Sequence, residues 1–283
     1  MSMFNSFDGT RLAHHSLGAG DPLICLPGGP MRASVYLGDL GGLSAHVRLV
    51  LLDLRGTGNS AAPVDLATYR LDRQVDDVEA LRVHLGLATV DLLAHSGGGS
   101  LAIAYGARYP ANVGRLVLVC PSPRAVGIGV TVDDRRAMAL LRRDEPWFPD
   151  AYAAFERVWS EAELDGDEQL IAPFFHGRWD DAHRAYDAQE PDQTNAEAAA
   201  MYYAAGAVDP DGIRSGLAQL PARVLLIAGE FDLALPPGRA AEYAGLFRHG
   251  ELAVQPGAGH SGWLDDPVWF VRTVTAFLHD GGR

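Results

Sequence analysis

The 283-residue sequence contains no lysine; all 23 of its basic residues are arginine. Walker-type phosphate loops, Schiff-base enzymes and Ser-Lys hydrolases each need a lysine amine, so the missing lysine excludes these sites. Acidic residues outnumber basic ones by 36 to 23, for a net charge of -13. Because nucleic acids and anionic membranes attract clustered positive charge, neither is an expected partner.

Cysteine is scarce as well. Cys25 and Cys120 each lie inside an apolar run, which predicts two buried, reduced thiols and no disulfide or cysteine-rich metal site. No run of about 18 apolar residues is present, and the first residues lack the basic start and apolar centre of a signal peptide. We therefore expect a cytoplasmic protein with no membrane partner.

What the sequence does contain is a regular alternation of strand and helix patterns. Short apolar runs alternate with helical segments, which predicts an α/β fold with a mostly parallel central sheet. Two further runs, 3–6 and 12–16, are separated by Asp8-Gly9 and predict an antiparallel hairpin at the sheet edge. The predicted parallel strands are 22–26, 47–53, 89–94, 115–120, 223–228 and 251–254, and the clearest helices are 72–85, 97–108 and 268–278.

This pattern stops between residues 124 and 219, where charged, alanine-rich and aromatic segments replace the strands. We predict a helical cap over 124–219, inserted into a core formed by 1–123 and 220–283. The cap window holds 19 acidic and 9 basic residues, so a cavity beneath it should favour cations, although such charges also solvate helix surfaces.

Ala94-His-Ser-Gly-Gly98 ends a predicted strand and opens a predicted helix. This is the context of a nucleophile elbow, in which small residues permit a tight turn that presents a serine above the sheet. A phosphate-binding loop is the alternative, but the glycines match neither the Walker spacing nor G-x-G-x-x-G. Ser96 is thus the predicted nucleophile. His95, beside it, is expected to have a structural role.

A serine nucleophile needs a general base and an acid that orients the base, in the chain order Ser, Asp or Glu, His for this type of fold. Asp232 and His260 each follow a predicted strand and should lie at the carboxyl edge of the sheet with Ser96. The oxyanion hole should combine the amide of Gly97 with that of Gly29, with Gly28 as its neighbour in Leu26-Pro-Gly-Gly-Pro30.

Five segments together resemble the α/β-hydrolase family: Leu26-Pro-Gly-Gly-Pro, Asp53-Leu-Arg-Gly-Thr-Gly-Asn-Ser60, Ala94-His-Ser-Gly-Gly, Gly229-Glu-Phe-Asp and Gly257-Ala-Gly-His. The resemblance runs from about residue 8 to residue 278. It implies a serine hydrolase with the triad named above and no metal or organic cofactor. It also implies that the segment 53–60 is mainly architectural.

Within that family, the Gly-Gly-Pro loop followed by Asp-x-Arg-Gly-x-Gly-x-Ser is similar to proline iminopeptidases, whose substrates carry a cationic amine. The sequence departs from them at Pro27, at Met31 and in the His-Ser-Gly elbow. Their amine-binding glutamates have only loose counterparts in the cap. The candidates for substrate contact are Gly28, Glu156, Trp159, Glu161, Glu197 and Tyr202.

Two enzymatic readings therefore remain open. One is a prolyl aminopeptidase acting on short peptides; the other is an esterase, lactonase or thioesterase acting on a small apolar acyl compound. A third reading is a ligand-binding protein that keeps the fold with little turnover. Epoxide or haloalkane chemistry is not expected, since those relatives place aspartate where this chain has Ser96. The sequence leaves the oligomeric state undetermined.

Overall fold

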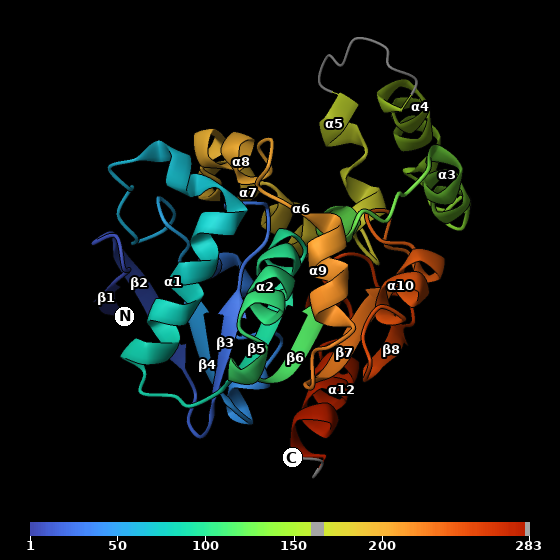
Figure 1. Cartoon of the computed structure of the whole chain (residues 1–283). Helices are drawn as coiled ribbons and strands as arrows, with labels where there is room; N and C mark the ends of the chain where they lie inside the picture. Colours follow the sequence, from blue (N-terminus) through green and yellow to red (C-terminus); the bar gives the residue numbers. More distant parts are fainter. Residues whose placement is uncertain (160–166, 281–283) are drawn as a thin grey trace.

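The computed structural model describes residues 1–159 and 167–280. Its centre is an eight-stranded sheet with the strand order β1-β2-β4-β3-β5-β6-β7-β8 (Figure 1). Strands β1 and β2 form the predicted edge hairpin, β2 pairs antiparallel with β4, and the remaining pairs are parallel. The strands are β1 Ser2–Asn5, β2 Arg11–Leu17, β3 Pro22–Leu26, β4 Arg48–Leu52, β5 Val90–His95, β6 Val113–Val119, β7 Arg223–Gly229 and β8 Gly250–Gln255.

Both faces of the inner parallel strands are buried, which explains their nearly continuous apolar sequences, whereas the edge strand β8 is mostly exposed. Successive side chains of a strand point to opposite faces, so Ile24 and Leu26 join one apolar cluster while Leu23 and Cys25 join another. Helices α1 (Leu71–His84), α2 (Gly97–Arg108), α9 (Pro210–Leu217) and α10 (Pro237–Ala244) contribute to the first cluster. Helices α11 (Gly262–Asp265) and α12 (Pro267–His279) contribute to the second.

The chain between β6 and β7 is helical in its described part, as predicted for the cap. Its further helices are α3 (Val132–Leu140), α4 (Phe148–Val158), α5 (Asp167–Leu170), α6 (Asp181–Asp187), α7 (Glu190–Gln193) and α8 (Ala196–Tyr202). Helices α3 and α4 share a small apolar cluster of their own, and they lie beyond the carboxyl ends of the strands (Figure 1). By contrast, α8 and α9 pack into the main core, so the exact limits of the cap remain a prediction.

No helix in the described ranges is both long and apolar enough to cross a membrane.

The segment 53–60 is held by buried polar contacts. The Arg55 guanidinium lies in the core, where its Nε donates to Asp77 of α1 at 2.8 Å and its Nη1 donates to Asp8 at 2.8 Å and to Thr68 at 2.6 Å. Asp77 is also fully buried. The network ties the edge hairpin to α1, which agrees with the architectural role expected for this segment.

We expect Asp77→Asn to lower the free energy of unfolding by about 3 kcal/mol, because it leaves the Arg55 charge buried with only part of its compensation. Urea unfolding measures this loss. Asp76→Asn is the matched control on the same helix, since Asp76 forms a largely exposed pair with Arg108 and should cost less than about 1 kcal/mol. Equal losses in the two variants would contradict the architectural role of Arg55.

Candidate active site

Ser96 occupies the sharp turn between β5 and α2. Its backbone has φ 50° and ψ -119°, a left-handed conformation that is rare and strained for a residue with a side chain. The turn leaves almost no space around it. A Cβ atom at Gly98 would lie 2.5 Å from the carbonyl oxygens of Leu26 and Pro27, so only glycine fits there. This is the geometry expected of a nucleophile elbow.

The loop after β3 packs directly against this turn. A Cβ atom on Gly28 would lie 2.8 Å from both the Ser96 Cβ and the His95 carbonyl oxygen, so the loop could not come this close with a larger residue. The amides of Gly29, in this loop, and of Gly97, which follows Ser96, are the predicted oxyanion donors. Neither donates a hydrogen bond within the described residues. The Gly97 amide is free because it opens α2, and helix N-termini favour negative charge.

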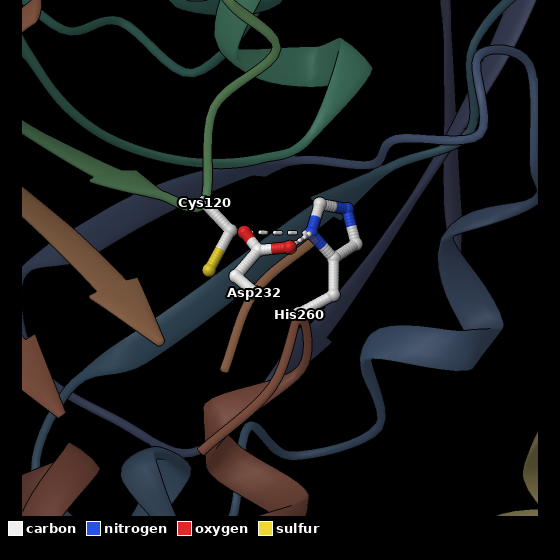
Figure 2. Close-up of side chains that lie close together, drawn as sticks. All are labelled: Cys120, Asp232 and His260. Carbon is white, nitrogen blue, oxygen red and sulfur yellow. Dashed lines mark hydrogen bonds and ion pairs between the residues drawn. The ribbon is translucent and has the colours of Figure 1, made fainter. Parts of the chain in front are cut away.

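Asp232 and His260 lie in the loops that follow β7 and β8, where they form a close pair. The Nδ1 atom of His260 lies 3.0 Å and 3.1 Å from the two carboxylate oxygens of Asp232, as Figure 2 shows. Asp232 is fully buried, and it also accepts a hydrogen bond from the Ala234 amide at 2.9 Å. The other ring nitrogen of His260 faces away from the carboxylate (Figure 2) and is free to exchange protons elsewhere.

Burial and charge act against each other in this pair. Burial disfavours the imidazolium form of His260, but the charge and the hydrogen bond of Asp232 outweigh it and raise the pKa of His260. Burial likewise disfavours the Asp232 carboxylate, but His260 holds its pKa below the ordinary value. The pair therefore stabilises a protonated imidazole, as a general base requires once it has accepted a proton.

The structure brings Ser96 and the Asp232–His260 pair to the same edge of the sheet. The ring of His95, next to Ser96, lies 4.8 Å from the ring of His260. In the described residues no hydrogen bond joins the Ser96 hydroxyl to the His260 imidazole. Such contacts are often long without substrate and shorten when substrate binds.

Cys120, at the end of β6, completes the surroundings of the pair (Figure 2). Among the residues that the structure describes, Cys120, Asp232 and His260 are the one group placed to share a metal ion, with ligand atoms within 4.8 Å of one another. Here the carboxylate and the imidazole already bind each other, so we interpret the group as part of a catalytic site. Both cysteines are buried and unpaired, as predicted, and burial raises the pKa of Cys120 far above its ordinary value.

Tyr202, predicted to contact substrate, has a different place. It is fully buried, and its hydroxyl donates a hydrogen bond of 3.1 Å to the carbonyl oxygen of Gly97. The side chain thus braces the first residue of α2 from below the elbow. Gly28, the other candidate in the core, lies against Ser96 as described above.

In the described part of the cap, Glu156 and Trp159 make their contacts with other cap residues. Glu156 forms two hydrogen bonds with Arg136, at 2.9 and 3.0 Å, which hold the pKa of Glu156 at about 2. The Trp159 ring packs on Phe155 at 4.5 Å inside the cluster shared by α3 and α4. Glu197 is exposed in the first turn of α8. Glu161 lies outside the described residues.

Two residues at the site carried no signal in the sequence. Tyr36 lies in a 3-10 helix, Ser34–Leu37, and its hydroxyl reaches both Gly28 and His95. Glu190 of α7 is close enough to His260 to contribute to its raised pKa, and it pairs with Arg32 at 3.2 Å. Neither belongs to a sequence motif. Their contacts at the site depend on how the 3-10 helix and α7 pack in the folded chain.

Comparisons with known proteins agree with the fold. A family model for the alpha/beta hydrolase fold matches residues 21–267. The chain is 26% identical over 279 residues to a putative 2-succinyl-6-hydroxy-2,4-cyclohexadiene-1-carboxylate synthase of Bacillus subtilis, covering 96% of each chain. It is 36% identical to a proline iminopeptidase of Heyndrickxia coagulans, but over only 104 residues, 37% of this chain and 36% of that one.

Among solved structures, an esterase from Exiguobacterium antarcticum superimposes with a TM-score of 0.74 at 21% identity, covering 98% of each chain. The fold, the order of the motifs and the family match agree over most of the sequence. The chain belongs to the α/β-hydrolase fold family.

Proposed function

We propose that this hydrolase cleaves acyl compounds through a covalent intermediate on Ser96, with His260 as general base and Asp232 as its orienting acid. The observation that carries the proposal is the buried Asp232–His260 pair beside a serine held in a strained, left-handed turn. A serine hydroxyl is a weak nucleophile by itself, and this arrangement supplies the base that activates it.

In the first half of the reaction, the Ser96 hydroxyl oxygen attacks the acyl carbon while its proton passes to Nε2 of His260. The carbonyl oxygen becomes an oxyanion, which the amides of Gly29 and Gly97 bind; neither amide donates elsewhere within the described residues. Asp232 stabilises the imidazolium that forms. The tetrahedral intermediate then collapses, the leaving group takes the proton from His260, and the acyl group stays on Ser96.

In the second half, water replaces the leaving group. His260 removes a proton from this water as the water attacks the acyl carbon, and a second oxyanion forms at the same two amides. When this intermediate collapses, the Ser96 oxygen regains the proton from His260 and the carboxylic acid leaves. Apart from substrate and water, every group in these steps belongs to the chain.

A small ester, lactone or thioester is the substrate class that the site supports best. An aminopeptidase needs a free carboxylate to receive the substrate amine, yet Glu156 is engaged with Arg136 and Glu197 is on the surface. The similarity to the Heyndrickxia coagulans proline iminopeptidase covers only 37% of this chain. The substrate should therefore be a neutral or anionic acyl compound.

One observation favours an aminopeptidase as the second candidate. The charge of Glu190 adds to that of Asp232 in raising the pKa of His260, and about half of the Glu190 side chain is exposed. Although it pairs with Arg32, it is a carboxylate that a substrate amine could share. Glu190 then takes the role that the sequence assigned to Glu156, Glu161 and Glu197.

The first experiment measures hydrolysis of p-nitrophenyl esters and of proline β-naphthylamide by the parent protein, Ser96→Ala and Glu190→Gln. We expect ester turnover that disappears in Ser96→Ala and persists in Glu190→Gln, with little cleavage of the amide. A fluorophosphonate should label the parent and leave Ser96→Ala unlabelled. Amide turnover that is lost in both variants would establish the aminopeptidase instead, and absence of labelling in folded parent protein would refute the hydrolase mechanism.

The pH profile tests the role of the pair. Only neutral His260 can accept a proton, so kcat/KM should fall as the pH drops below the pKa of His260, which Asp232 raises above about 6.5. Asp232→Asn removes the negative charge, so the acidic limb should move to lower pH while kcat falls roughly 10³- to 10⁴-fold. An acidic limb that stays in place in Asp232→Asn would mean that another group controls the reaction.

A further inference from the structure

His95 and Tyr36 form a hydrogen-bonded chain that joins three loops of the site. The Gly28 amide donates to the Tyr36 hydroxyl oxygen at 2.6 Å. The Tyr36 oxygen lies 2.8 Å from Nδ1 of His95, and Nε2 of His95 lies 3.0 Å from the carbonyl oxygen of His260. The chain thus runs from the loop of the oxyanion hole, past the residue before Ser96, to the backbone of the catalytic histidine.

The two ends of this chain determine its direction. The Gly28 amide can only donate, so the Tyr36 oxygen accepts there. In a neutral His95 ring with its proton on Nε2, Nδ1 can only accept, so the Tyr36 hydroxyl donates to it. The His260 carbonyl can only accept, so Nε2 of His95 must carry the ring proton. Every donor and acceptor is used once, and His95 is neutral with one defined tautomer.

The surroundings support a neutral ring. Tyr36 and His95 are both buried, and the Trp263 ring meets the His95 ring edge-on at 4.8 Å. Burial, and then the charge of nearby His260, hold the pKa of His95 well below its ordinary value. A second proton on His95 would also leave the Tyr36 hydroxyl with two donors facing it and no acceptor for its own proton.

His14 is a buried histidine whose ring makes no such hydrogen bonds in the part of the chain that the structure describes. It is as buried as His95, but within the described residues neither of its ring nitrogens has a hydrogen-bond partner. It packs between Phe4 and His84 at the edge of the sheet. His95, by contrast, uses both nitrogens, and both reach loops of the active site.

We propose that Tyr36 and His95 are positioning residues, which hold the loop of Gly28 and Gly29 and the backbone of His260 in register around Ser96. The Tyr36 hydroxyl anchors the amide of Gly28, so the adjacent Gly29 amide remains free for the oxyanion. His95 anchors His260, so its imidazole keeps its alignment with Asp232. This inference rests on the proposed serine hydrolase function.

Tyr36→Phe removes the anchor of the Gly28 amide and leaves the ring in place. We expect kcat for a p-nitrophenyl ester to fall at least about tenfold, with KM changed less than about twofold, because a misplaced oxyanion donor weakens the transition state more than the ground state. Tyr243→Phe is the matched control, since Tyr243 is equally buried and its hydroxyl has no partner among the described residues. It should keep the parent kcat.

Two variants of His95 separate the two contacts of its ring, which we call the Tyr36 arm (Nδ1 to the Tyr36 hydroxyl) and the His260 arm (Nε2 to the His260 carbonyl oxygen). Asparagine places an amide oxygen near the position of Nδ1, so His95→Asn should keep the Tyr36 arm and lose the contact with His260. Glutamine places an amide nitrogen near the position of Nε2, so His95→Gln should keep the contact with His260 and lose the Tyr36 arm. The kcat of His95→Gln should therefore resemble that of Tyr36→Phe.

The pH profile reports the His260 arm. The ionisable groups that act on His260 or share its surroundings are Asp232, His95, Cys120 and Glu190, and the Arg32 guanidinium lies over the Tyr36 ring. Releasing the His260 backbone should loosen its hydrogen bond to Asp232, which lowers the pKa of His260. The acidic limb of kcat/KM should then move to lower pH in His95→Asn and stay in place in His95→Gln and Tyr36→Phe. Thermal melts confirm that each variant is folded.

Nitrogen-15 NMR of His95 tests the chain without any turnover. We expect one neutral tautomer with the proton on Nε2 from about pH 5 to about pH 9. A proton on Nδ1, or titration in this range, would overturn the inference by itself. Unchanged kcat and pH profiles in folded Tyr36→Phe and His95→Asn would also overturn it. Parent protein that cleaves no ester would instead refute the proposed function. The NMR result would still show whether the hydrogen bonds from Gly28 through Tyr36 and His95 to His260 have the proposed direction.

Discussion

The left-handed backbone at Ser96 is the constraint on which the rest of the site depends. A strand that passes directly into a helix leaves no space beside the turning residue, which is why only glycine fits at positions 28 and 98. Because those glycines carry no side chain, the loop after β3 can approach Ser96 closely. The same turn begins α2, whose first amides have no partner within the helix. One tight turn thus fixes the backbone of Ser96 and sets how closely the loop of Gly28 approaches it.

Support for this turn comes from buried groups in other elements of the fold. The Tyr202 hydroxyl holds the Gly97 carbonyl from one side, and the Tyr36–His95 chain holds Gly28 and His260 from the other. Each contact joins elements that are distant in the sequence. A strained backbone persists only where its surroundings hold it in place, and these hydrogen bonds supply part of that restraint.

The net negative charge of the cap window overstates how many carboxylates are free to bind a substrate cation. The window 124–219 is strongly acidic, which by itself suggests attraction for a cationic substrate. In the described part of the cap, however, Glu156 pairs with Arg136, and Asp180 accepts two hydrogen bonds from His183. Such carboxylates stabilise helices and helix ends. Net charge over a segment is therefore a poor guide to what a cavity beneath it binds.

The sequence by itself determined the fold and the elements of the site. Strand and helix periodicity predicted the parallel sheet, the edge hairpin and the helical stretch before β7, and local motifs indicated Ser96, Asp232 and His260. These features are readable because each depends on neighbouring residues: alternating apolar positions, a small residue beside a turn, or a polar residue at a strand end. Parallel strands then bring their carboxyl ends to one edge, whatever the loops contain.

Only the tertiary structure decided which other residues meet at that edge. Tyr36, Glu190 and Tyr202 belong to no motif, and their contacts depend on how a 3-10 helix and two cap helices pack against the loops. The same holds for Glu156, whose partner is on another helix. Long-range packing fixes the direction of each side chain and the partner it finds, and neither quantity is encoded in the few residues on either side.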